Sequence, residues 1–178
     1  MSERGPDPIP MDGPDAESWS AFLEEAGAVA DEYRDDGWDV IDVQPGDVTP
    51  VDVPDHERFG FSVLVPDSEY EAVESLVEDE SVAFETSEVF YHTAGETVFV
   101  LAVELDETAE TAVVIPLYYR RPRTRELVTT ALENGELPVH VRRLSVDQWV
   151  TFAHDEPSLF VPDDGDANSD TSASDEAK

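Results

Sequence analysis

The chain has 178 residues, of which 43 are Asp or Glu and 10 are Lys or Arg, giving a formal net charge of −33. Apolar residues make up 40% of the chain, which is enough for one hydrophobic core and excludes a purely acidic, low-complexity segment. The absence of cysteine excludes disulfides, thiolate nucleophiles and cysteine-based metal sites.

The acidic residues are spread along the whole chain, and Lys178 is the sole lysine. In dilute buffer this charge destabilises a compact state by self-repulsion, whereas the Debye length falls to about 3 Å at 1 M salt. We therefore expect halophilic adaptation; the alternative is an acidic mimic of nucleic acid. Because no apolar run has the length of a signal segment or a membrane span, we expect a soluble, cytoplasmic protein without membrane contact.

The first expected elements follow a loose arm at residues 1–14, which is rich in Pro, Gly and Asp. Apolar residues at helical spacing predict a helix over 15–36. Asp15 can cap the start of this helix and Gly37 its end. Residues 38–43 then alternate as a strand does.

The next segment contains three prolines within residues 44–58, which predict a long loop or a broken edge strand. Residues 59–65 follow as a strand. A helix is predicted over about 68–79, with Ser68 and Glu71 forming a capping box at its start.

A hairpin is predicted from residues 82–92 and 97–105. Its second arm contains the run 98–103, which is apolar on both faces and indicates a central strand covered on both sides. Residues 112–119 form another expected strand, and Pro116 within it favours an edge position or a strand end.

The last expected elements are a helix over about 123–134 and strands at 139–143 and 149–154. Residues 162–178 contain mainly Asp, Ser, Ala and Thr, and we expect a disordered acidic tail.

Together these elements predict a single α+β domain over residues 15–161. We expect three helices packed on one mixed, mostly antiparallel sheet of about six or seven strands. Residues 59–105 and 111–154 each follow the order strand, helix, strand, strand, which suggests a possible duplicated β-α-β-β unit.

Five short stretches carry a resemblance to other proteins: residues 38–40, 45–50, 63–66, 111–116 and 150–154. Through them, most of the expected domain resembles a family of uncharacterised haloarchaeal proteins of unknown function. The resemblance implies a salt-adapted cytoplasmic protein and implies no catalytic residue.

The most informative local feature is an inversion of charge. Residues 120–143 carry six arginines and only three glutamates, a net charge of +3, whereas the rest of the chain carries −36. Four of these arginines lie at the start of the last helix, where free N–H groups attract anions. Arginine recognises phosphate or carboxylate, and tyrosine can stack on a ring. The candidates for anion binding are Tyr118, Tyr119, Arg120, Arg121, Arg123, Arg125, His140, Arg142 and Arg143.

The alternative role for these arginines is ion pairing with the surrounding carboxylates or a subunit contact, which the composition favours. In concentrated salt, counterion release adds little to nucleic-acid affinity, which argues against a nucleic-acid partner. A homo-oligomer, a protein partner and a small anionic ligand all remain open.

No catalytic motif is present: the chain lacks a P-loop, a dinucleotide-binding glycine fingerprint, Gly-x-Ser-x-Gly and His-Glu-x-x-His. His56 and His154 have acidic neighbours, but such neighbours are common in a chain with 43 acids. We therefore expect a binding or interaction domain with no catalytic residue, metal or cofactor. The alternative is an enzyme or binding protein that acts on an anionic small molecule at the Arg- and Tyr-rich surface.

Overall fold

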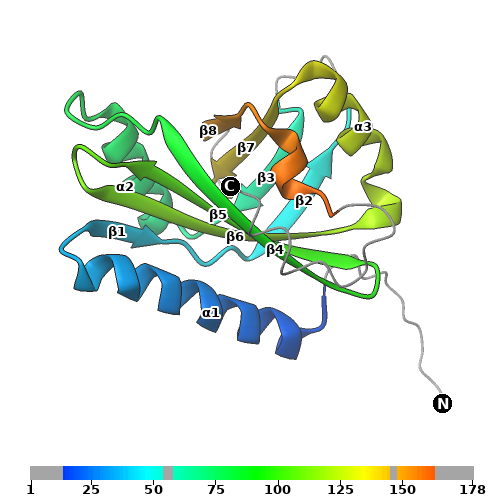
Figure 1. The fold of residues 1–178 in the computed structure, drawn as a ribbon, viewed down its shortest axis with the longest axis horizontal. Helices are drawn as coiled ribbons and strands as arrows, with labels where there is room; N and C mark the ends of the chain where they lie inside the picture. The colour runs from blue at the N-terminus through cyan, green and yellow to red at the C-terminus, as the bar shows by residue number, and fades with distance from the viewer. Residues whose placement is uncertain (1–13, 54–57, 145–147, 163–178) are drawn as a thin grey trace.

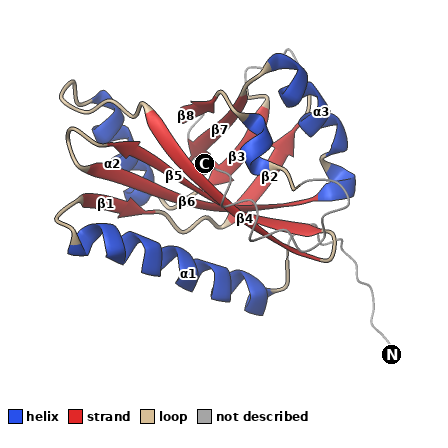
Figure 2. Cartoon of the chain, viewed as in Figure 1, coloured by secondary structure: helices blue, strands red, loops and turns tan. Residues whose placement is uncertain are grey.

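The computed structural model describes residues 14–53, 58–144 and 148–162. Two four-stranded sheets face each other, one helix covers the outer face of the first sheet, and two helices lie at opposite ends of the molecule (Figures 1 and 2). Apart from Pro14 and Pro162, the arm expected at 1–14 and the tail expected at 162–178 lie outside the described residues.

Helix α1 (Ala16–Asp35) forms as the apolar spacing predicts. The Asp15 side chain accepts a hydrogen bond from the Ser18 backbone N–H at 3.3 Å, so the predicted N-cap is confirmed. Phe22, Ala26 and Ala30 are buried on one stripe of this helix, which packs against the first sheet.

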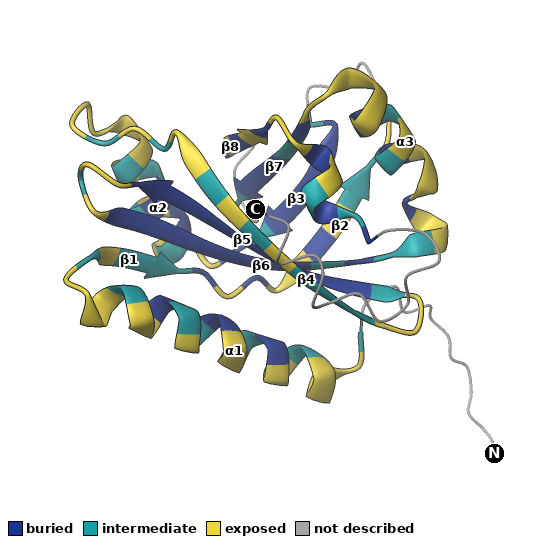
Figure 3. Ribbon diagram, viewed as in Figure 1, coloured by how far each residue is buried: buried dark blue, intermediate teal, exposed yellow. Residues whose placement is uncertain are grey.

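The first sheet has the order β1 (Asp39–Asp42), β6 (Thr111–Arg120), β5 (Thr97–Asp106) and β4 (Thr86–Ala94). The β1–β6 pair is parallel, and the other two pairs are antiparallel. Helix α1 covers one face of β5, and the second sheet covers the other face. Nearly all of β5 is therefore buried (Figure 3), and the prediction of a strand covered on both sides is confirmed.

The second sheet has the order β2 (Asp47–Val51), β3 (Gly60–Leu64), β7 (Leu137–Arg142) and β8 (Trp149–His154). Only the β3–β7 pair is parallel. Gly60 has a φ of +123°, and a Cβ added there would lie 2.2 Å from the Pro138 carbonyl oxygen. A side chain at Gly60 would therefore push β3 away from β7.

The larger apolar core lies between the sheets, and helices α2 (Asp67–Glu78) and α3 (Arg125–Asn134) pack against it. Two short 3₁₀ helices, η1 (Arg121–Arg123) and η2 (Pro157–Phe160), precede α3 and follow β8. The Phe160 side chain of η2 is fully buried in this core. None of the described helices combines the length and the apolar character needed to cross a membrane.

The predicted α+β class, the single domain and the three helices are confirmed, but the eight strands in the described part of the chain form two sheets where we expected one. Alternation shows which face of a strand is buried, whereas sheet membership depends on long-range pairing.

The predicted β-α-β-β order occurs twice, as β3-α2-β4-β5 and as β6-α3-β7-β8. The first strand of one unit, β3, pairs in parallel with β7, whereas the first strand of the other unit, β6, pairs antiparallel with β5. The two units therefore share the order of their elements and differ in strand pairing.

The capping box predicted for α2 is wrong. The residue before α2 is Pro66, which makes no side-chain cap, and the Glu71 side chain pairs with Arg143 and does not fold back onto the helix start.

The edge position predicted for Pro116 applies to one part of β6. Pro116 lies inside β6 and pairs with Leu101 of β5, but β1 pairs with β6 only as far as Val114. Pro116 has no N–H to continue that ladder, so it marks where β1 ends.

Candidate functional site

The predicted anion-binding residues fall into two groups, and the first lies between β6 and α3. Arg120 forms an ion pair with Glu96 at 2.5 Å, and Arg123 and Arg125 are exposed on the surface. The Thr124 hydroxyl donates to the Arg120 carbonyl at 3.0 Å, and no side chain caps the N-terminus of α3.

The two tyrosines of this group serve the packing of the fold. The Tyr119 hydroxyl is buried and donates to the Phe160 carbonyl at 2.8 Å, and burial raises the pKa of this phenol far above its usual range. The half-buried Tyr118 ring lies edge-on to Trp19, with ring centroids 5.0 Å apart.

The second group lies on β7 and just after it. The buried His140 ring contacts the Thr151 hydroxyl and the Phe59 carbonyl, each at 2.8 Å. The Arg142 Nε donates to the Ser62 hydroxyl at 3.0 Å.

Arg143 belongs to the α2 end of the molecule, where it pairs with Glu71 at 3.2 Å and lies 5.0 Å from the centre of the Tyr70 ring. The first group lies beside α3 at the opposite end (Figure 1). The described residues therefore do not gather the nine candidates around one cavity, and anion binding at either group stays a prediction.

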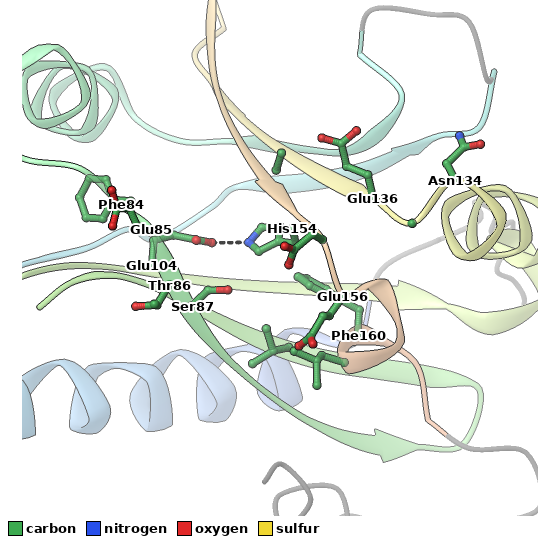
Figure 4. A pocket seen from close by; sticks show the side chains of 15 residues that line it. Phe84, Glu85, Thr86, Ser87, Glu104, Asn134, Glu136, His154, Glu156 and Phe160 are labelled. Atoms are coloured by element: carbon green, nitrogen blue, oxygen red, sulfur yellow. Dashed lines mark hydrogen bonds and ion pairs between the residues drawn. The ribbon is translucent and has the colours of Figure 1, made fainter.

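A cavity of about 650 Å³ opens between the two sheets, at the edge where β4 and β8 are the outermost strands (Figure 4). A smaller cavity of about 240 Å³ shares Phe84, Glu104 and Ala153 with it. The larger cavity is lined by Phe84, Glu85, Thr86, Ser87, Val89, Glu104, Asn134, Gly135, Glu136, Ala153, His154, Asp155, Glu156, Leu159 and Phe160.

A buried ion pair lies at this cavity and joins the two sheets. Glu104 of β5 is 4% exposed and His154 of β8 is 5% exposed. The Glu104 Oε2 and the His154 Nε2 are 2.6 Å apart, as the dashed line in Figure 4 marks. The other ring nitrogen of His154, Nδ1, lies 3.0 Å from the Leu137 carbonyl oxygen.

These partners determine the protonation of His154. A carbonyl oxygen only accepts hydrogen bonds, so Nδ1 carries a proton, and a further proton lies between Nε2 and the Glu104 Oε2. Burial alone would lower the pKa of His154, but the hydrogen bond and negative charge of Glu104 outweigh burial and raise it above its ordinary value. We therefore treat the pair as an imidazolium beside a carboxylate.

Glu104 differs in its surroundings from the other acids. Among the described residues, only Glu104 and Asp106 are buried carboxylates. Asp106 accepts backbone hydrogen bonds from Ala83 at 2.7 Å and Ala109 at 3.0 Å, which stabilise a turn and lower its pKa. Glu104, in contrast, has a titratable partner in His154 and is among the residues that line the cavity.

The charge of the cavity lining is negative. Four exposed carboxylates, Glu85, Glu136, Asp155 and Glu156, line the cavity together with the neutral pair of Glu104 and His154, and no Lys or Arg is among the described lining residues. Among the described residues, no three His, Asp or Glu side chains are placed to hold a metal ion together.

His154 has acidic neighbours in the sequence, but its pairing with Glu104 was not predicted. One signal was present, because Glu104 directly follows the apolar run 98–103 on a strand predicted to be covered on both sides. A carboxylate in such a place requires a partner, yet the sequence does not show which strand provides it.

A protein-family model matches residues 11–162, and its description is a family of unknown function. The chain belongs to the DUF7529 family. The resemblance to a family of unknown function is confirmed, while its haloarchaeal origin stays a prediction. Neither the curated proteins nor the solved structures contain a significant match to this member of the family.

Proposed function

We propose that this member of the DUF7529 family is a binding domain for a small organic cation, which the cavity between the sheets holds with Glu104 as its anchoring carboxylate. The observation that carries the proposal is the buried pair of Glu104 and His154 at a cavity whose described lining residues include five carboxylates and no Lys or Arg. An anionic ligand would be repelled by this lining.

The size and walls of the cavity support a small-molecule ligand. Its volume of about 650 Å³ falls in the range of about 300–1,000 Å³ that is typical of ligand pockets. Phe84, Leu159 and Phe160 provide apolar surface for the carbon skeleton of a ligand. The cationic end of such a ligand can then approach the Glu104 carboxylate.

Binding is favoured over catalysis by the hydrogen bonds of His154. A general base needs a nitrogen lone pair within reach of the substrate proton. In the ligand-free protein both ring nitrogens of His154 have protein partners, at 2.6 and 3.0 Å. Before a ligand binds, the pair therefore suits charge recognition better than proton abstraction.

We also propose that the protein is adapted to concentrated salt, is cytoplasmic and is of haloarchaeal origin. The net charge of −33 and the single lysine support this proposal. Under it, the exposed carboxylates interact with solvent and counterions, whereas the buried Glu104 has a separate, specific role.

The test of the cation site compares two variants that each lose one negative charge. Glu104→Gln should weaken binding of n-butylammonium by about 10–100-fold, because a hydrogen bond to a charged group contributes about 1.5–3 kcal/mol. Glu24→Gln changes an exposed residue of α1 outside the cavity and should change affinity less than about twofold. Isothermal titration calorimetry in 2 M KCl measures both affinities, with sodium butyrate as the anionic comparison.

An equal loss of affinity for n-butylammonium in the two variants would contradict a specific site, because it would mean that the cation associates with the acidic surface as a whole. Tighter binding of butyrate than of n-butylammonium would contradict the assigned charge of the ligand.

A further inference from the structure

The arrangement around His154 restricts how a cation can reach Glu104. The imidazolium already donates to the Glu104 Oε2 at 2.6 Å, so the carboxylate is neutralised before a ligand arrives. A cationic ligand would place a second positive charge beside one buried carboxylate. Excess buried charge is unfavourable at low dielectric, and the complex relieves it most simply by losing a proton.

Resting on the proposed function, we infer that the cavity selects primary ammonium ligands and that each binding event releases one proton from His154 to solvent. In the complex, Nδ1 keeps its proton and continues to donate to the Leu137 carbonyl. The Nε2 atom then has a free lone pair, and both it and Glu104 accept hydrogen bonds from the ligand. One positive charge enters and one proton leaves, so the net charge at the pair is unchanged.

The charged groups facing His154 come from every element around it. Glu104 lies on β5, Glu85 precedes β4, Glu136 precedes β7, and Asp155 and Glu156 follow β8. The element η2 contributes the Phe160 ring, whose centroid is 4.9 Å from that of His154. Since all of these charged groups are carboxylates, none repels an ammonium ion, and the proton of His154 is its main competitor.

The ligand class follows from the two acceptors. An aliphatic primary ammonium keeps its charge near neutral pH, as lysine does with a pKa of about 10.4, and it has three N–H donors. A quaternary ammonium has the same charge but no N–H, so it cannot bond to Nε2 and Glu104. The cavity should therefore distinguish n-butylammonium from its N-trimethylated counterpart.

The test measures the protons exchanged when n-butylammonium binds to the full chain in 2 M KCl at pH 6. Calorimetric titrations in phosphate and in MES, which both buffer near pH 6 and differ in ionisation enthalpy, give the number of protons released from the dependence of the binding enthalpy on the buffer. We expect close to one proton per ligand, and affinity that rises about tenfold per pH unit until His154 loses its proton in the free protein. The trimethylated compound should bind at least tenfold more weakly.

The outcomes separate this inference from the proposed function. Binding of n-butylammonium without proton release, or equal affinity for the trimethylated compound, would overturn the inference and leave the cation site standing. No binding of either compound would overturn both. The His154→Gln variant should bind without exchanging protons, but the buffer comparison on the native chain is decisive even if that variant fails to fold.

Discussion

The pair of Glu104 and His154 places two ionisable groups where water is nearly absent. Bringing charges out of water costs several kcal/mol per ion, and their attraction offsets that cost only when the geometry is good and other hydrogen bonds are made. Here the Nε2–Oε2 distance is 2.6 Å and the Leu137 carbonyl accepts the remaining imidazole proton. The pair therefore links the two sheets beside the cavity.

Glu104→Gln should make the stability of the protein depend differently on pH. Because the pKa of His154 is raised in the folded state, the stabilisation linked to its proton is fully present below the unfolded pKa of about 6.5. This stabilisation is lost as the pH rises through the folded pKa. Glutamine can hydrogen-bond to neutral imidazole but cannot stabilise the cation, so the variant should be about 1–3 kcal/mol less stable at pH 6, and the difference should shrink toward pH 9.5.

Urea unfolding of both proteins in 2 M KCl, followed by circular dichroism at a series of pH values, measures this difference. If the difference in the free energy of unfolding between the two proteins stays constant or widens as the pH rises, His154 is not the titrating partner of Glu104.

Local patterns in the sequence predicted most of the individual elements. The apolar stripe and Asp15 located α1 to within one residue at each end, and alternation located β8 at its observed bounds. The apolar run 98–103 correctly indicated a central strand. In each case the decisive interactions lie within a few residues along the chain or on one face of one element.

The pairing of elements could not be predicted in the same way. Glu104 and His154 are 50 residues apart in sequence, and they meet because β5 and β8 belong to different sheets that face each other. The Arg-rich segment shows the converse, since arginines of one stretch of the sequence lie at different ends of the molecule. Arg120 pairs with Glu96, whereas Arg143 pairs with Glu71.

At the scale of the whole molecule, the net charge of −33 opposes compaction unless it is screened. We expect the free energy of unfolding to rise as KCl is added and to level off above about 1 M, where the Debye length is about 3 Å. Urea unfolding at KCl concentrations from 10 mM to 3 M measures this dependence. Equal stability at the two extremes would mean that the acidic surface is not an adaptation to salt.

The central claim is that the exposed carboxylates interact with salt, whereas Glu104 binds an organic cation inside the fold. Its most direct measurement is the dissociation constant of n-butylammonium at 0.5 and 3 M KCl, obtained by calorimetry on the native chain. Because buried charges are screened far less than exposed ones, we expect one site per chain and less than about a threefold change in affinity. A loss of more than tenfold, or saturation by several ligands per chain, would assign the binding to the acidic surface and contradict the account.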